Sequence, residues 1–220
     1  MTGRVPLVLA SASPARLATL RSAGIEPTVV VSDVDEVAVL RAAQDRLGEL
    51  APADVALLLA RAKCEAVAAG QPDAVVIGCD SVLELDGTIH GKPADAAEAV
   101  ARWERMSGRF GILHTGHWLR DERDDAAGGS GATLGATAST TVHFATLSGD
   151  EIEAYVATGE PLQVAGAFTV DGLGGAFVTR IEGDHHNVVG LSLPLLRDLM
   201  TQVGVGWFDV ASSAAGAQGK

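Results

Sequence analysis

The sequence contains few cysteines and no long uninterrupted apolar run. Its two cysteines, Cys64 and Cys79, lie inside apolar segments without the CxxC spacing or the histidine cluster of a zinc site, so we expect buried free thiols. Hydrophobic residues make up 47% of the chain, but no run approaches the roughly 18 residues of a membrane span. The first residues also lack the charged and then apolar pattern of a signal peptide. We therefore expect a soluble, cytoplasmic protein without a membrane partner.

Positive charge is also scarce. The chain has 16 Lys and Arg against 28 Asp and Glu, which gives a formal net charge of -12. Because affinity for a phosphate backbone comes from clustered Lys and Arg, this balance argues against polymeric nucleic acid as a partner. Any bound phosphate must be held by a few local cations and by backbone N–H groups.

Apolar periodicity predicts strands and helices that interleave along a single domain, residues 1–208. The expected strands span 6–10, 28–31, 73–78, 81–85, 88–89, 110–119, 165–170 and 176–181. The expected helices span 14–23, 53–69, 95–106 and 194–203, and one more begins at a capping box of Ser148 and Glu151. An Asp86-Gly87 turn joins 81–85 to 88–89 as a hairpin, which requires antiparallel neighbours. The predicted fold class is therefore α/β, with a mixed sheet flanked by helices.

Two segments lack any apolar period. Residues 121–136 are charged and then rich in glycine, which predicts a mobile surface loop between two strands. Residues 209–220 are rich in Ala, Ser and Gly, which predicts a disordered tail.

The segment LASASPARLATL, residues 9–20, joins an expected strand to an expected helix. Ser13 is well placed as the N-cap, and Pro14 takes the first helical position, where its missing N–H costs nothing. The same turn would aim free backbone N–H groups at one point, where Ser11, Ser13 and Arg16 add hydroxyl groups and a positive charge that suit a phosphate. The residues alone leave both interpretations open, a helix cap or a phosphate site.

Carboxylates gather at two places. Residues 32–36 hold three acids in five positions, a pattern typical of a solvated turn unless another acid meets it. Asp80 follows the apolar run AVVIG and should stand at the carboxyl end of a central strand, where α/β sheets bind ligands. Paired acids of this kind suit Mg²⁺ or Mn²⁺. Lys92, in Gly-Lys-Pro, is a weak phosphate signal, and Lys63 is expected on the exposed face of its helix.

Several motifs, taken in order, resemble the Maf family of nucleoside triphosphate pyrophosphatases. They are LASASPARLATL, DVDE, ARAK, GCDSVLELDGTIHGKP, HTG, YVATGEPLQVAGAF and NVVGLSLPLL, and they extend from about Leu7 to Leu196. The resemblance implies an elongated sheet with two lobes around a nucleotide cleft, as in inosine triphosphatase-like proteins, and often a homodimer. It also implies hydrolysis of a nucleoside triphosphate between its α and β phosphates, with Mg²⁺ or Mn²⁺ as a divalent cofactor.

The resemblance further implies roles for individual residues. Asp80 matches the catalytic acid that accepts the proton of the attacking water, and Glu36 matches an acid that shares the metal with Asp80. The positions that bind the triphosphate match Ser11, Arg16, Lys63 and Lys92. Cations and a metal gathered in this way would stabilise the leaving pyrophosphate.

Three positions depart from the substrate patterns of the family. Members that act on dTTP and UTP carry Arg, Thr and Gln where this chain has Ala15, Ser81 and Asp171, and members that act on 7-methyl-GTP carry an aromatic residue, Gln and Glu. A carboxylate at Asp171 only accepts hydrogen bonds, which suits a guanine edge or a cationic methylated base better than thymine or uracil. We expect Ser81 and Asp171 to contact the substrate; the base preference stays open, with a lean away from strict dTTP specificity.

The alternative function is that of a nucleotide-binding regulator of septum formation in dividing cells. The family takes its name from inhibition of septum formation. A protein that only binds nucleotide needs cations but has no need of a base beside a metal. The presence of Asp80, Glu36 and Lys92 therefore favours an enzyme that removes non-canonical or surplus nucleoside triphosphates.

Overall fold

The computed structural model describes residues 4–211. The strands are β1 (Leu7–Ala10), β2 (Thr28–Val29), β3 (Val75–Leu85), β4 (Thr88–His90), β5 (Phe110–Asp121), β6 (Thr133–Phe144) and β7 (Val178–Glu182). The α-helices are α1 (Pro14–Ser22), α2 (Glu36–Leu47), α3 (Pro52–Ala68), α4 (Ala96–Met106), α5 (Gly149–Ala157), α6 (His185–Val189), α7 (Leu193–Gln202) and α8 (Trp207–Val210). Short 3-10 helices are η1 (Asp125–Ala127), η2 (Glu160–Gln163), η3 (Ala165–Ala167) and η4 (Leu173–Phe177). In this described range no helix combines the length and the apolar character needed to cross a membrane.

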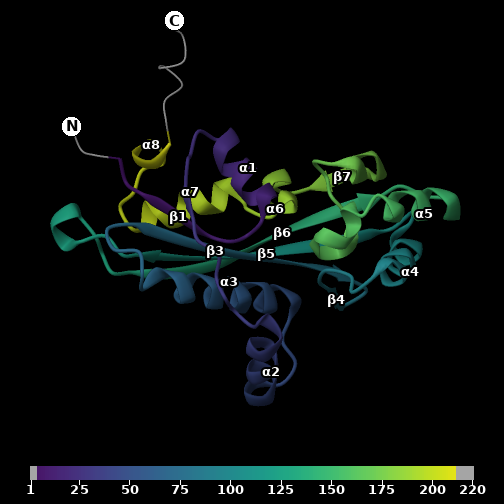
Figure 1. Cartoon of the computed structure of the whole chain (residues 1–220), viewed down its shortest axis with the longest axis horizontal. Helices are drawn as coiled ribbons and strands as arrows, with labels where there is room; N and C mark the ends of the chain where they lie inside the picture. Colours follow the sequence, from purple (N-terminus) through teal and green to yellow (C-terminus); the bar gives the residue numbers. More distant parts are fainter. Residues whose placement is uncertain (1–3, 212–220) are drawn as a thin grey trace, which may run out of the picture.

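The strands of residues 4–211 form one mixed sheet of seven strands in the order β2-β1-β3-β5-β6-β7, with β4 beside β3. β1 is parallel to both of its neighbours, whereas the other pairs are antiparallel. Because β3, β5 and β6 are long, the sheet is elongated, and helices lie on both of its faces (Figure 1). The predicted fold class is confirmed.

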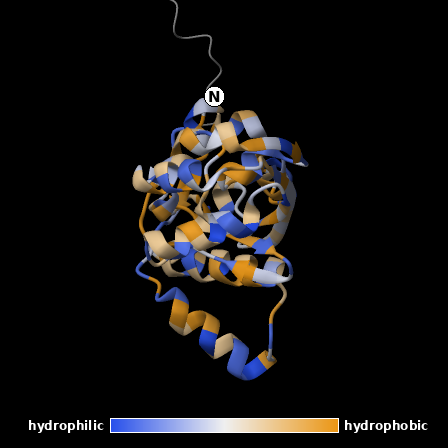
Figure 2. Ribbon diagram, turned by 90° about the vertical axis from the view of Figure 1, so that its right-hand side faces the viewer, coloured by the Kyte–Doolittle hydropathy of each residue, from blue (hydrophilic) through white to orange (hydrophobic). Residues whose placement is uncertain are grey.

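The helices divide the surroundings of the sheet into distinct layers (Figure 1). α3 lies along one face, α1, α6 and α7 lie on the other, and α4 and α5 pack at the far end. α2 projects away from the sheet beyond α3, and Figure 2 shows it standing apart from the rest of the molecule.

The two largest hydrophobic clusters lie in different halves of the sheet. One contains Leu9 and Ile77, together with the inner face of α7. The other contains Leu83, Trp103 and Phe144. β3 contributes to both clusters, so its middle joins the two lobes that the family resemblance implies.

The middle of β3 is paired on one side only. β1 ends at Ala10, opposite Gly78, and β4 ends at His90, opposite Leu83. Within the described residues, 79–82 therefore pair with β5 alone. Both short strands run toward this opening, so the chain that follows each of them passes directly into it.

The expected pair of strands at 73–78 and 81–85 is in fact one continuous strand, β3. The glycine and the polar residues at its centre interrupt the apolar pattern but not the backbone. The expected turn at its end is confirmed, since Asp86 and Gly87 have φ values of 52° and 74°, the left-handed values of a two-residue hairpin turn.

The expected strand at 165–170 is wrong. Gly166 and Ala167 have φ values of 76° and 61°, which a strand does not allow. The Trp103 indole donates a hydrogen bond to the Ala167 carbonyl at 2.7 Å. The apolar residues are thus buried by 3-10 turns rather than by strand pairing.

The expected long loop is shorter than predicted. β5 continues to Asp121 and β6 begins at Thr133, so only residues 122–132 connect them. The Asp121 carboxylate accepts hydrogen bonds from Arg123 and Ser130 within the connection. Mobility of this loop stays a prediction.

The disordered tail predicted for residues 209–220 was placed too early in the sequence. α8 includes residues 209 and 210, and Val210 and Ala211 are buried against the core. Residues 212–220 lie outside the described part of the chain.

His117 links β5 to the start of α7. Its Nε2 accepts a hydrogen bond from the Ser192 N–H at 2.8 Å, so its Nδ1 carries the proton and donates to the Thr115 carbonyl at 3.0 Å. The side chain is fully buried, and burial lowers the pKa of His117 to about 4. The folded protein therefore holds this imidazole neutral.

The buried His117 predicts acid sensitivity of the fold. An unfolded histidine titrates near 6.5, so the unfolded chain binds more protons between pH 6.5 and about 4, and stability falls as the pH is lowered through this window. Complete protonation of the unfolded imidazole corresponds to about 3 kcal/mol. Urea unfolding at several pH values should show that His117→Gln is less stable than the wild type at pH 7 and that the gap narrows toward pH 4. A constant gap would contradict this, and the exposed His185→Gln serves as the control.

Candidate functional site

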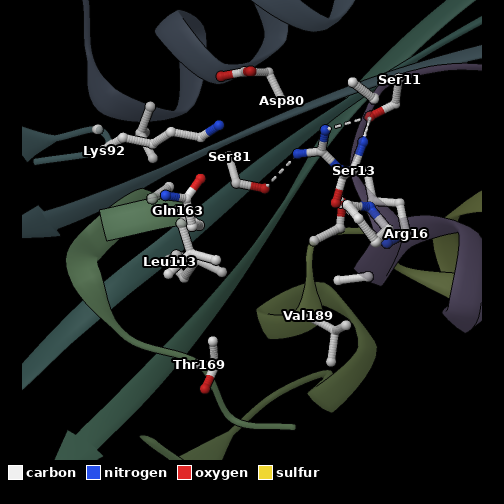
Figure 3. Close-up of a pocket in the computed structure, with 18 of the residues that line it drawn as sticks. Ser11, Ser13, Arg16, Asp80, Ser81, Lys92, Leu113, Gln163, Thr169 and Val189 are labelled. Carbon is white, nitrogen blue, oxygen red and sulfur yellow. Dashed lines mark hydrogen bonds between the residues drawn. The ribbon is translucent and has the colours of Figure 1, made fainter. Parts of the chain in front are cut away.

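A cavity of about 800 Å³ opens at the unpaired stretch of β3. All of the site residues expected from the sequence line this cavity: Ser11, Ser13, Arg16, Glu36, Lys63, Asp80, Ser81, Lys92 and Asp171. Figure 3 shows one end of the cavity with Asp80, Ser81, Lys92 and the turn that carries Ser11, Ser13 and Arg16. Leu113, Thr169 and Val189 lie toward the other end. The cavity thus has a charged end and a more apolar end.

The turn between β1 and α1 confirms the expected helix cap. The Ser13 hydroxyl accepts a hydrogen bond from the Arg16 N–H, and Pro14 occupies the first helical position. The Ser11 hydroxyl accepts from the Ser13 N–H at 3.2 Å. The turn is therefore built by short-range hydrogen bonds before any ligand is present.

The Arg16 guanidinium is held in place by three acceptors. Its Nε donates to the Gly190 carbonyl at 2.7 Å, and its two terminal nitrogens donate to the hydroxyls of Ser11 and Ser81 at 3.1 Å each (Figure 3). The side chain has five N–H groups in a fixed plane. Two N–H groups beyond these three bonds can therefore serve an anion in the cavity.

Ser81 is the first link of a hydrogen-bond chain behind Arg16. The Thr115 hydroxyl donates to the Asn187 carbonyl at 3.1 Å, so it accepts from the Ser81 hydroxyl at 2.9 Å. The only hydroxyl proton of Ser81 is then used within the protein. In this arrangement Ser81 orients Arg16, and its expected contact with a substrate stays a prediction.

Close packing of α3 on the sheet brings Lys63 to Asp80. A Cβ atom on Gly78 would lie 2.4 Å from the Ala60 carbonyl oxygen, and one on Gly116 would lie 2.3 Å from the Ala56 carbonyl oxygen. The two glycines lie on adjacent strands and allow the helix backbone to touch the sheet. The Lys63 side chain is consequently only 12% exposed, in contrast to the exposed lysine that a helical surface predicts.

Lys63 bonds two carboxylates at once. Its Nζ lies 2.5 Å from Asp80 Oδ1 and 2.7 Å from Glu36 Oε1. Glu36 is the first residue of α2, whose N-cap is Asp35. This helix was not predicted from the sequence, where its start has the pattern of a turn, although the Asp35 cap was a usable signal.

The environment of Asp80 sets its charge state. Burial raises the pKa of the Asp80 carboxyl above its ordinary value, while the positive charges of Lys63 and Arg16 act in the opposite direction and Glu36 raises the pKa further. The two cations thus favour the ionised form that a proton acceptor needs. Its chain neighbour Cys79 is not a competing nucleophile, because burial raises the pKa of that thiol to about 12.

Lys92 approaches the charged end from the other short strand. It follows β4, and its exposed side chain extends into the cavity (Figure 3). The preceding Gly91 carbonyl accepts hydrogen bonds from Arg102 of α4 at 2.6 Å and from the Gly166 N–H at 3.1 Å. The backbone that carries Lys92 is therefore fixed from two sides.

The apolar end contains residues that the sequence analysis did not assign. Leu113, Thr169 and Val189 lie toward this end (Figure 3), and Phe168, Val188, Glu160 and Gln163 also line the cavity. Most of these residues lie inside the motifs YVATGEPLQVAGAF and NVVGLSLPLL, but no single-residue signal marked them. This end suits a planar group such as a nucleobase, with a few polar partners at its edge.

The order and spacing of these motifs agree with one protein family. A sequence model of the family described as Maf-like protein matches residues 6–203. The chain belongs to the Maf family.

Relatives of this Maf chain share about half or more of its residues. A protein of Salinispora tropica is 58% identical over 93% of this chain and 88% of the relative, and one of Streptomyces coelicolor is 56% identical over 91% of each. A protein of Nostoc punctiforme is 50% identical over 90% of this chain and 94% of the relative. Each of the three is named nucleoside triphosphate pyrophosphatase.

Similarity to a solved structure is much weaker. A nucleoside-triphosphatase, or dITP/XTP pyrophosphatase, from Mycobacterium abscessus has a TM-score of 0.36 and 17% identity, over 65% of this chain and 76% of its own. Similarity at this level supports no conclusion about the Maf chain.

The shared ammonium predicts opposite effects of two substitutions on Asp80. Lys63→Met removes the nearest positive charge and should raise the pKa of the Asp80 carboxyl, whereas Glu36→Gln removes a negative charge and should lower it. Carbon-13 NMR titration of labelled aspartate would measure both. Arg61→Met, an exposed cation on the same helix, should leave the titration unchanged. An equal pKa in the wild type and Lys63→Met would show that the ammonium does not control Asp80.

Proposed function

We propose that this Maf-family chain is a nucleoside triphosphate pyrophosphatase that releases a nucleoside monophosphate and pyrophosphate. The observation that carries the proposal is the buried Asp80 carboxylate, bonded to Lys63 in a cavity that Arg16 and Lys92 also line. The names of relatives at 50–58% identity support the same activity.

In the proposed reaction, water attacks the α phosphorus of the bound triphosphate. The new phosphorus–oxygen bond forms as the bridging bond to the β phosphate breaks, and the electron pair leaves with pyrophosphate. Asp80 accepts the proton of the water, which requires its ionised form. Arg16, Lys63 and Lys92 offset the negative charge that develops on the phosphates.

A divalent cation fits the acids at this site. Asp80 and Glu36 meet at one Nζ atom, and Mg²⁺ is commonly bound by one or two carboxylates together with substrate phosphates. The described residues contain no group of three or more His, Cys, Asp or Glu side chains that could hold a metal ion, so the substrate would supply the remaining ligands. When bound, Mg²⁺ or Mn²⁺ would neutralise phosphate charge. A cation held by both carboxylates would compete with Lys63 for them.

The substrate is proposed to be a canonical or modified nucleoside triphosphate, with removal of non-canonical nucleotides as the physiological role. Asp171 lines the cavity as a group that only accepts hydrogen bonds, which supports a guanine or a cationic methylated base over thymine. The cytoplasmic location and the homodimer stay predictions.

The Asp80→Asn variant should separate binding from turnover. The amide keeps the size of the side chain but cannot accept the proton, so kcat should fall by about 10²- to 10⁴-fold, while nucleotide affinity is retained. Pyrophosphate release from a panel of triphosphates, with and without Mg²⁺ or Mn²⁺, would measure this. Asp86→Asn, in the exposed hairpin turn, is the matched control.

Two results would change the interpretation. Full turnover in Asp80→Asn would remove Asp80 from the mechanism. Binding of nucleotide by the wild type without release of pyrophosphate would favour the nucleotide-binding regulator of septum formation.

A further inference from the structure

The Glu160 carboxylate is surrounded by hydrogen-bond donors. Glu160 begins η2, directly after Gly159. Its Oε1 accepts from the Tyr155 hydroxyl at 2.9 Å, the Thr169 hydroxyl at 2.5 Å and the Gly174 N–H at 3.0 Å. Its Oε2 accepts from the Leu173 N–H at 3.0 Å. One side chain thus joins α5 to both ends of the segment 169–174.

This segment wraps tightly around the carboxylate. A Cβ atom on Gly172 would lie 2.5 Å from Glu160 Oε2, and one on Gly174 would lie 2.2 Å from the Tyr155 hydroxyl oxygen. The Tyr155 hydroxyl also accepts from the Thr169 N–H at 3.3 Å. The path of the backbone is therefore fitted to Glu160 and Tyr155.

An ionised carboxylate is the group that satisfies these donors. Burial acts to raise the pKa of Glu160, but the hydrogen bonds from Thr169, Leu173 and Gly174 outweigh it and hold the pKa below its usual value. A carboxylate accepts on both oxygens, whereas a glutamine amide would turn an NH₂ group toward at least one of the same donors. Both the negative charge of Glu160 and its lack of hydrogen-bond donors therefore help to hold segment 169–174 in place.

The held segment carries Asp171 at its centre. Asp171 lies two residues after Thr169 and two before Leu173, and it is exposed at the wall of the cavity. Within residues 4–211, the Asp171 carboxylate makes no hydrogen bond or ion pair. A free acceptor therefore stands on a segment whose two ends are anchored to one carboxylate.

We propose that Glu160 is a positioning residue for substrate specificity, which holds segment 169–174 so that Asp171 meets the nucleobase. The inference rests on the proposed function, since it assigns the apolar end of the cavity to the base. Both carboxylate oxygens of Glu160 accept hydrogen bonds from the protein itself, so Glu160 acts on the base through Asp171.

The test compares a nucleotide with its phosphate chain alone. Isothermal titration calorimetry would measure α,β-methylene-GTP, which resists cleavage, and inorganic tripolyphosphate, which has no base. Glu160→Gln should weaken the binding of the nucleotide analogue by about tenfold, the equivalent of one hydrogen bond to a charged group. Binding of tripolyphosphate should change by less than about twofold, because the charged end of the cavity is untouched.

A purely structural role predicts a different pattern. If Glu160 only stabilises the fold, both ligands should weaken together, and that result would overturn the proposal, as would unchanged affinity for both in a folded variant. In an Asp171→Ala background, Glu160→Gln should cause little further loss of affinity for the nucleotide analogue, because Glu160 acts on the base only through Asp171. Fully additive losses would contradict the proposed route through Asp171.

Two other variants complete the design. Glu151→Gln changes the capping-box carboxylate of α5, which does not line the cavity, and should alter neither affinity. If Glu160→Gln does not fold, Thr169→Val removes one donor and should weaken the nucleotide analogue alone by a few-fold.

The outcomes remain separate from those of the proposed activity. Wild-type binding of the analogue without pyrophosphate release from GTP would refute the activity and leave the role of Glu160 standing. Equal wild-type affinity for the analogue and tripolyphosphate would show that the base is not bound and would refute the role of Glu160.

Discussion

The one-sided pairing of β3 is the constraint on which the site depends. At residues 79–82 this strand has β5 as a neighbour on one side, while β1 and β4 end short of the other. The turn that carries Ser11 and Arg16 follows β1, and the loop that carries Lys92 follows β4. Both segments therefore reach the same opening. A longer β1 or β4 would close the opening with backbone pairing. The missing neighbour therefore creates the space and also delivers the cations to it.

The carboxylate in this opening is buried and paired with an ammonium group. Asp80 points toward α3, and α3 lies close enough to supply Lys63 because Gly78 and Gly116 have no side chains. On the other side of the strand, Ser81 orients Arg16. Two successive residues of one strand, Asp80 and Ser81, thus supply the proposed proton acceptor and orient a cation, since successive side chains point to opposite faces.

Local sequence signals account for much of the fold. The cap at Ser13, the hairpin turn at Asp86 and the capping box at Ser148 were predicted because each depends on neighbours within a few residues. α2 and α6 were missed since they are short or projecting, with little apolar periodicity. The segment 165–170 was assigned wrongly, because its apolar residues are buried by contacts with α4 that local periodicity does not report.

The candidate site was predicted as a set of residues but not as a geometry. The family motifs marked Asp80, Glu36 and Lys63, and the structure brings all three together. The burial of Lys63 depends on two glycines far apart in the sequence, so helical periodicity alone predicted the opposite. Glu160 had no separate signal, because three of its four donors come from segment 169–174, which folds back onto it.

The most direct measurement of the reaction is its stereochemical course at phosphorus. A single diastereomer of an α-thio nucleoside triphosphate would be hydrolysed in ¹⁸O-water, and the configuration of the monophosphate product would be read by phosphorus NMR. Direct attack of water, with Asp80 accepting its proton, requires inversion and places the label in the monophosphate. Retention of configuration would contradict this mechanism, because it requires two displacements and a covalent intermediate on the enzyme.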